Sequence, residues 1–166
     1  MPPCKDNIIN IPVIFILKYA LNCFFCKSVT LLAMSSSTNN RLKLELEYPL
    51  RSSTHVLYQY ISNPSGLQSW FADYVDIIAS RRYRFRWEDD TEVNAVLVRN
   101  VTNKYIRFTL DNAHTDDEYL EFRISQDDIT GDVELIITEF IDSGEEDMVA
   151  SIWDSAVDSL RQVIGA

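Results

Sequence analysis

Aromatic side chains are the residues whose type and spacing point most directly to a chemical role. Tyr83, Phe85 and Trp87 alternate along one segment, and other rings recur at equivalent positions of neighbouring segments. Such rings either wall a cavity for an apolar ligand or fill a core, since they bury a large area in both cases. The residues alone favour the core. The candidates for lining a ligand cavity are Trp70, Phe71, Tyr83, Phe85, Trp87, Phe108, Phe122, Phe140, Trp153 and Leu160.

Polar groups at similar positions suggest two further sites. Arg82, Arg84 and Arg86 alternate with the aromatic residues and form a basic stripe on the opposite face. An anion site is one interpretation, but pairing with acidic residues of neighbouring strands explains the stripe better. A cyclase or hydrolase would instead need polar groups inside a cavity, and the candidates are Asn94, Arg99 and Tyr105.

Residues typical of metal sites or covalent catalysis do not form a set. His55 and His114 have no second ligand at a suitable spacing, and the Cys23–Cys26 pair lacks the strand and helix of a redox site. No phosphate-binding loop, dinucleotide fingerprint or nucleophile elbow is present. We therefore predict no catalytic residue, no metal and no cofactor, and this favours a protein that is not an enzyme.

Periodic segments predict the elements that position these side chains. Residues 41–48 alternate between apolar and charged types, as in a half-buried strand. Two short helices follow, one over residues 52–62 with hydroxyl N-caps and one beginning at Asn63-Pro64. The remaining strands are predicted at residues 82–87, 92–101, 104–110, 119–125 and 133–141, the last of them apolar on both faces and therefore central or covered twice.

A long helix is predicted at the end of the chain, over residues 144–164. Ser143 and Glu146 have the spacing of a capping box, and Gly165 follows the last turn. Its apolar stripe consists of Val149, Trp153, Ala156, Leu160 and Ile164. Because the strands are segregated from the helices, the fold class is α+β with a sheet covered on one face.

Charge and cysteine content divide the chain near Met34. The formal net charge is −10, which makes nucleic acid and anionic membranes poor partners. All three cysteines lie within residues 1–33, where Lys18 interrupts the apolar residues and argues against a membrane span. We interpret residues 1–33 as an upstream extension from a misplaced start or as a signal-like segment, and residues 34–40 as a polar, disordered lead-in. Residues 41–166 are the domain, expected in the cytoplasm, or outside it if the signal is real.

The domain resembles the START-like superfamily, whose fold is called the helix grip, and within it the proteins similar to the Hsp90 ATPase activator. The resemblance covers residues 41–165 and rests on the opening strand with Pro49, the segments 56–64 and 66–71, Arg107-Phe108, and the closing helix with Trp153 and Leu160. One departure is visible, because the family often has a glycine where this chain has Ser80-Arg81.

This resemblance implies a curved antiparallel sheet of about six to seven strands, two short helices after the first strand, and a long C-terminal helix across the sheet. It also implies one of three functions. We expect a non-enzymatic domain that binds a small apolar or amphipathic ligand between the sheet and the helix. The alternatives are a protein-interaction module, linked to chaperones and showing an exposed apolar patch, and a cyclase or hydrolase. Ligand identity and oligomeric state do not follow from the sequence.

Overall fold

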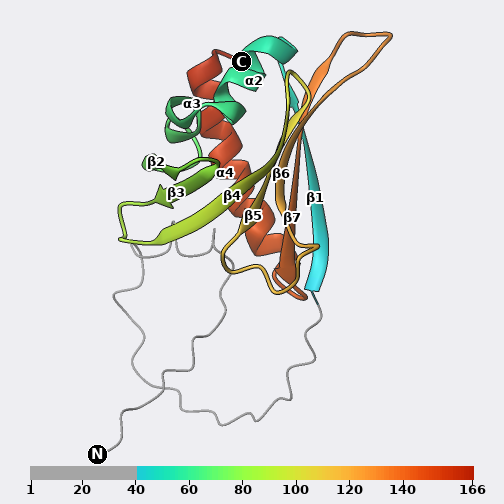
Figure 1. Ribbon diagram of the computed structural model, residues 1–166. Coiled ribbons are helices and arrows are strands. Elements are labelled where there is room, and N and C mark those ends of the chain that lie inside the picture. Colours follow the sequence, from blue (N-terminus) through green and yellow to red (C-terminus); the bar gives the residue numbers. More distant parts are fainter. Residues whose placement is uncertain (1–40) are drawn as a thin grey trace, which may run out of the picture.

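The computed structural model describes residues 41–166, and these form one sheet and three helices (Figure 1). The predicted extension 1–33 and lead-in 34–40 lie outside the described residues. The strands are β1 Arg41–Leu50, β2 Tyr74–Ala79, β3 Arg82–Arg86, β4 Glu92–Val101, β5 Tyr105–Leu110, β6 Leu120–Gln126 and β7 Val133–Asp142. The helices are α2 Thr54–Ser62, α3 Pro64–Gln68 and α4 Glu146–Ile164.

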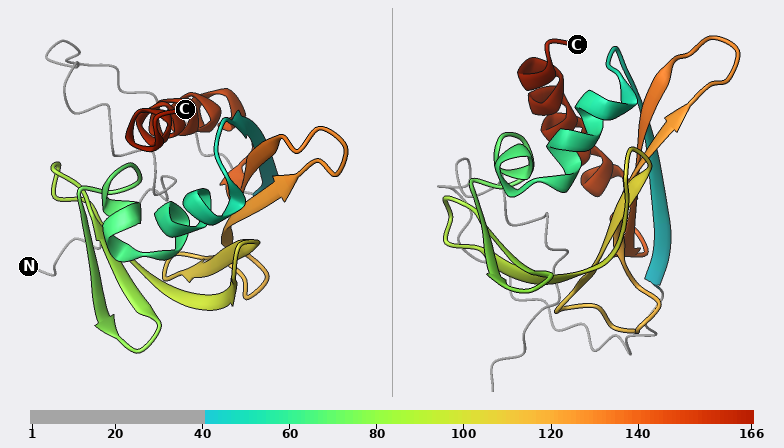
Figure 2. Two further views of the ribbon diagram at one scale, coloured as in Figure 1. Left: turned by 90° about the horizontal axis from the view of Figure 1, so that it is seen from above. Right: turned by 45° about the horizontal axis from the view of Figure 1, so that its top comes forward.

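The sheet has the strand order β1-β7-β6-β5-β4-β3-β2, and every neighbouring pair is antiparallel. It curves around the three helices, which all lie on one face (Figure 2). We call this the inner face and the opposite one the outer face. The predicted α+β helix-grip fold is therefore confirmed, and β7 is flanked by β1 and β6 as expected of a central strand. Within residues 41–166, no helix is long and apolar enough to cross a membrane.

The two short helices are joined by a close backbone contact. The hydroxyl of Ser53 accepts a hydrogen bond from the N–H of Val56 at 3.2 Å and caps α2. Pro64 occupies the first turn of α3, where its missing N–H costs nothing. At Gly66, a Cβ atom would lie 2.4 Å from the carbonyl oxygen of Gln59, so only glycine lets α3 approach α2 this closely. This contact fixes where the chain after α3 begins.

The start of α4 differs from the prediction. The helix begins at Glu146 with Glu145 as its N-cap, and no side chain caps it. Gly144 has a left-handed backbone with φ of +97°, and its N–H donates to the carboxylate of Glu146 at 2.8 Å. The predicted capping box is wrong because the turn at Gly144 separates Ser143 from the helix. The predicted end is confirmed, since Gly165 is left-handed with φ of +73° and its N–H bonds the carbonyl of Arg161.

Strand β2 is the one strand that the sequence pattern does not predict. It forms the edge of the sheet, and it pairs only with β3 among the described strands. The β2–β3 turn contains Arg81, which has a left-handed backbone with φ of +62°. Its carbonyl accepts from the N–H of Leu97 at 2.7 Å, which holds the turn against β4. The turn thus takes, with arginine, a conformation that glycine adopts more readily.

Candidate ligand pocket

Phe71 lies at the centre of the aromatic residues on the inner face. Its ring is 5.1 Å from Phe85, 5.8 Å from Trp87 and 5.5 Å from Phe122, all edge to face, and it stacks on Trp153 at 5.8 Å. These distances are typical of favourable ring pairs. The space between β3 and α4 is therefore occupied by the ring of Phe71.

Eight of the ten predicted residues belong to this single cluster. Trp70 joins it through Phe122, and Tyr83 and Phe108 join it through Phe85. Leu160 is fully buried on α4. The complete cluster consists of Trp70, Phe71, Tyr83, Phe85, Trp87, Phe108, Phe122 and Trp153.

Phe140 is the exception, and its predicted place in the interior is wrong. It is half-buried and packs edge to face on Tyr119 at 5.2 Å, in register with Lys43 on β1. Both neighbours belong to the outer face. The residues of β7 that face inward are Val133, Leu135, Ile137, Glu139 and Ile141, so a glutamate holds the inward position next to Phe140.

A pocket of about 250 Å³ opens beside the cluster, between α4 and the segment joining α3 to β2. All three tryptophans of the chain line it, together with Phe71. We call it the tryptophan pocket. Its volume lies just below the usual range for small-molecule sites. The full lining is Gln68, Ser69, Trp70, Phe71, Ala72, Asp73, Trp87, Ile152, Trp153, Ala156 and Ser159.

Hydrogen bonds fix the three indole rings. Trp70 donates to the carbonyl of Tyr60 at 3.1 Å, and Trp87 donates to the carbonyl of Phe71 at 2.9 Å. Trp153 donates to the carboxylate of Glu139 at 2.9 Å. Each ring is thus tied to a different part of the chain, namely α2, the segment between α3 and β2, and β7.

Glu139 is the one charged residue in the inward row of β7. It is 5 % exposed. Burial raises the pKa of its carboxyl to about 7, while the Trp153 N–H and the Arg41 guanidinium act in the opposite direction. Because both faces of β7 are largely apolar, the strand alternation in the sequence does not show that Glu139 points inward. Asp73, on the rim of the pocket, carries no sequence signal either, because its place depends on how α3 packs.

Comparison with known proteins assigns the family. The sequence pattern of the START-like superfamily domain matches residues 38–166. The chain belongs to the START-like superfamily. No curated protein matches the sequence.

Several solved structures resemble this START-like domain. A Bacteroides fragilis protein solved by NMR is 33% identical, with a TM-score of 0.53, over 75% of this chain and 91% of that chain. The Aha1 dimer from Colwellia psychrerythraea is 12% identical, with a TM-score of 0.59, over 74% and 96%. A protein of unknown function from Enterococcus faecalis is 17% identical, with a TM-score of 0.56, over 76% and 72%. The last two likenesses show the fold alone.

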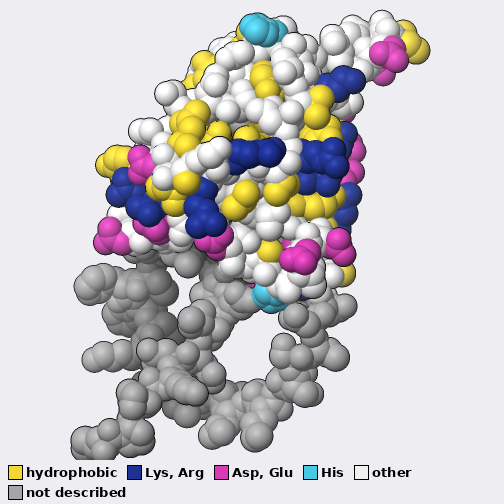
Figure 3. Space-filling model, viewed as in Figure 1, with side chains coloured by type: hydrophobic (Ala, Val, Ile, Leu, Met, Phe, Trp, Pro, Cys, Tyr) yellow, Lys and Arg dark blue, Asp and Glu magenta, His cyan; other side chains and the backbone are white. Residues whose placement is uncertain are grey.

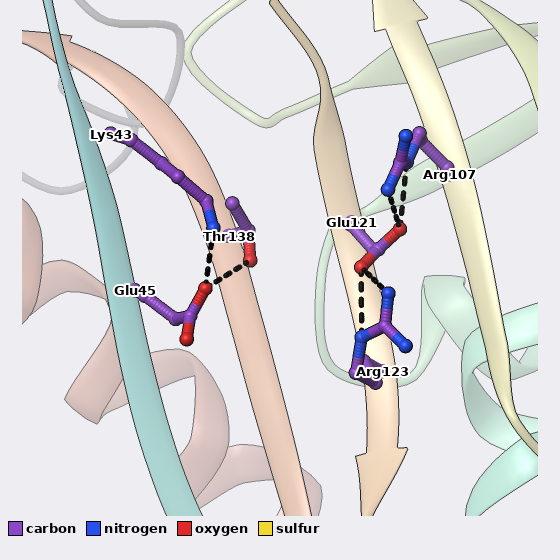
Figure 4. A network of polar contacts seen from close by, with 6 residues as sticks. All are labelled: Lys43, Glu45, Arg107, Glu121, Arg123 and Thr138. Atoms are coloured by element: carbon purple, nitrogen blue, oxygen red, sulfur yellow. Dashed lines mark hydrogen bonds and ion pairs between the residues drawn. The ribbon is translucent and has the colours of Figure 1, made fainter.

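The outer face of the START-like domain carries a different kind of site. Glu121 is 2 % exposed and lies between Arg107 and Arg123, each 2.7 Å from one of its oxygens (Figure 4). Each guanidinium also covers a tyrosine ring, Arg107 that of Tyr119 at 3.8 Å and Arg123 that of Tyr105 at 4.7 Å. Lys and Arg side chains form a broken row across this face (Figure 3). Glu121 thus joins Arg107 of β5 to Arg123 of β6 on this face.

The predicted pairing of the arginine stripe is confirmed for two of its members. Arg84 forms an ion pair with Glu92 of β4 at 3.2 Å. Arg86 forms one with Asp76 of β2 at 3.1 Å. These are exposed pairs between neighbouring strands, as expected of a solvated face.

The three polar residues expected for a cyclase or hydrolase do not reach the pocket. Asn94 is paired with Arg84, Arg99 with Arg107, and Tyr105 with Arg123, so all three side chains belong to the outer face. Their predicted place in a cavity is wrong because the strand alternation directs them away from α4. Within residues 41–166, no group of three His, Cys, Asp or Glu residues is arranged to hold a metal.

Proposed function

We propose that this START-like domain is a non-enzymatic binding domain for a small apolar or amphipathic molecule, held in the tryptophan pocket. The observation that carries the proposal is the pocket itself, since all three tryptophans and Phe71 converge on it. Aromatic walls offer apolar contact area, and the polar rim of Gln68, Asp73 and Ser159 offers partners for one polar end. The adjacent Phe71 fills the centre of the fold, so the ligand lies beside the aromatic cluster and not within it.

The test uses the three tryptophans as reporters. A panel of small aromatic and alkyl compounds is titrated into protein labelled with ¹⁵N, and the three indole N–H signals are followed, one for each tryptophan. We expect at least one compound to shift these signals in a saturable manner and to raise the melting temperature. A panel without any such compound would contradict the proposal.

Two substitutions on α4 show whether binding uses this pocket. Ala156→Phe places a ring inside the pocket, and Val163→Phe adds the same group at an exposed position of the same helix. We expect Ala156→Phe to abolish the shifts and Val163→Phe to preserve them. Undiminished binding by Ala156→Phe would show that the ligand binds outside the tryptophan pocket.

A second candidate function is self-association through the sheet edge at β2. Tyr74, Ile77 and Ile78 are 52%, 54% and 41% exposed, which is unusual for large apolar residues on an edge strand. Two copies of β2 related by a two-fold axis would pair antiparallel and partly cover these exposed residues at the shared edge. The similar Aha1 from Colwellia psychrerythraea is a dimer.

Light scattering at increasing protein concentration tests this second candidate. We expect the wild-type protein to form dimers and Ile78→Lys to remain monomeric. The matched control is Val98→Lys, an exposed apolar residue on β4 away from the edge strand. A wild-type protein that stays monomeric at all concentrations would contradict it.

A further inference from the structure

The tryptophan pocket is poor in hydrogen-bond donors. The indole N–H groups of Trp70, Trp87 and Trp153 all donate to acceptors of the protein itself. The hydroxyls of Ser69 and Ser159 donate to helix carbonyls at 2.6 and 3.1 Å. A ligand therefore meets the oxygen atoms of these groups more readily than their hydrogens.

The backbone N–H groups of residues 69–72 also have acceptors within the protein. The N–H of Ser69 donates to the carbonyl of Gly66, and those of Trp70, Phe71 and Ala72 donate to the carbonyl of Leu67. Among the side chains that line the pocket within residues 41–166, Gln68 alone keeps N–H groups for a ligand. An anionic ligand needs several donors or a cation, and the lining side chains supply one amide.

The charge of the pocket also disfavours an anionic ligand. Asp73 is the only acidic or basic residue in the lining, and one of its oxygens accepts from the N–H of Glu88 at 2.9 Å. This bond fixes the carboxylate at the rim and leaves its other oxygen for a ligand. The domain as a whole is also acidic, since residues 41–166 hold 12 Lys and Arg against 24 Asp and Glu. A positive ligand is attracted by both.

We propose that the tryptophan pocket selects an organic cation, such as an alkylammonium or arylammonium group, with Asp73 as its counter-ion and the indole rings as its apolar contacts. This inference rests on the proposed function, because it names the ligand class of the same pocket. Ammonium groups are bound by carboxylates and by the faces of aromatic rings, and tryptophan is the best of these rings. A neutral ligand gains the apolar contacts alone, and an anionic ligand is repelled by Asp73.

Two compounds of the same shape separate charge from size. Phenyltrimethylammonium carries one positive charge, and tert-butylbenzene replaces its nitrogen by carbon. We expect the first compound to bind about tenfold more tightly than the second, followed by the indole N–H signals, which corresponds to one strong cation–aromatic contact. Phenylacetate serves as the anionic comparison and is expected to bind most weakly.

Asp73→Asn tests the assigned counter-ion. We expect it to bring the affinities of phenyltrimethylammonium and tert-butylbenzene close to each other. The matched control is Asp128→Asn, which removes one negative charge from the exposed β6–β7 turn and should leave the tenfold preference in place. A preference that survives in Asp73→Asn would overturn the role of Asp73.

The remaining outcomes distinguish this inference from the function on which it rests. Equal binding of phenyltrimethylammonium and tert-butylbenzene to the wild-type protein would overturn the cation preference and leave the ligand pocket intact. If neither compound nor any member of the wider panel shifts the indole signals, the pocket itself and the proposed function are both wrong.

Discussion

Two buried glutamates lie on opposite faces of the same sheet, and the protein stabilises their charges in different ways. Glu121 on the outer face is 2 % exposed, and Arg107 and Arg123 each hold one of its oxygens at 2.7 Å. Glu139 on the inner face is 5 % exposed, and its carboxylate receives one hydrogen bond, from the Trp153 indole. Similar burial thus produces a paired ion on one face and a group that resists ionisation on the other.

The comparison also explains why the inner face can tolerate a carboxyl group. Desolvation raises the pKa of Glu139 to about 7, so near neutral pH a substantial fraction of this group is protonated and uncharged. The neighbouring charged groups, Arg41 from β1 and Glu145 before α4, act on it in opposite directions. The inner face therefore holds a titratable group beside the wall of the tryptophan pocket, while the outer face holds a fixed ion-pair network.

The largest effect is expected from Glu139→Gln, which keeps an acceptor for Trp153 and removes the titration. Because the folded-state pKa lies above the ordinary value of 4.5, the folded state binds the proton more tightly, and wild-type stability falls as pH rises from about 4.5 to about 7. At pH 8 the variant should be more stable than the wild type by about 3 kcal/mol, and at pH 5 by less than about 1 kcal/mol.

Urea unfolding at pH 5 and pH 8 measures both differences. Glu47→Gln is the control, since it removes the same charge from an exposed position of β1. A stability difference for Glu139→Gln that is the same at both pH values would contradict the assignment of the titration to Glu139.

The second largest effect is expected from the corresponding change on the outer face, Glu121→Gln, and it has the opposite sign. The substitution leaves Arg107 and Arg123 close together without the carboxylate that joins them. Charge-assisted hydrogen bonds of this kind contribute about 1–3 kcal/mol, so the variant should be less stable by that amount at pH 8. A variant as stable as the wild type would mean that the network orients these side chains without adding to the free energy of unfolding.

The sequence predicts the side chains of the outer face more completely than those of the inner face. On β5 and β6, apolar residues alternate with Arg107, Glu121 and Arg123 in strict period two, so the outer position of these charged side chains follows from the sequence. Tyr105 belongs to the same row, so its predicted place in a cavity conflicts with this alternation. On β7 both faces are largely apolar, so the alternation alone does not show which residues point inward. The sequence alone therefore predicts Phe140 on the inner face and does not indicate that Glu139 is buried there.

The pocket shows a second limit of the sequence. Trp70, Phe71, Trp87 and Trp153 were recognised as inner residues because each belongs to a periodic segment. The gap between them depends on how closely α3 approaches α2 at Gly66 and on where Phe71 places its ring. Such distances are set by tertiary packing, which local periodicity does not encode. Asp73 enters the lining only through that packing.

A smaller effect is expected from Trp153→Phe, which sharpens the comparison by removing the donor to Glu139 and keeping a ring. The pKa of Glu139 should rise further, because the indole N–H opposes the effect of burial. Between pH 5 and pH 8, Trp153→Phe should therefore lose about 1 kcal/mol more stability than the wild type loses.

The control for this variant is Trp70→Phe, which loses an indole hydrogen bond to the Tyr60 carbonyl and leaves Glu139 untouched. Both variants should be less stable overall because a smaller ring leaves a gap. Only Trp153→Phe should change the pH dependence, so an unchanged pH dependence in this variant would contradict the coupling between the indole and the carboxyl.

The smallest effect is expected from salt, and it separates the two faces once more. The side chains of Arg107 and Arg123 are 30% and 44% exposed, so added ions reach the outer network. The stability difference between the wild type and Glu121→Gln should shrink by a few tenths of a kcal/mol between 0.05 M and 1 M NaCl. The difference between the wild type and Glu139→Gln at pH 8 arises from desolvation and should change less. Equal salt dependence of the two differences would mean that solvent reaches both glutamates alike, and the contrast between the faces would fail.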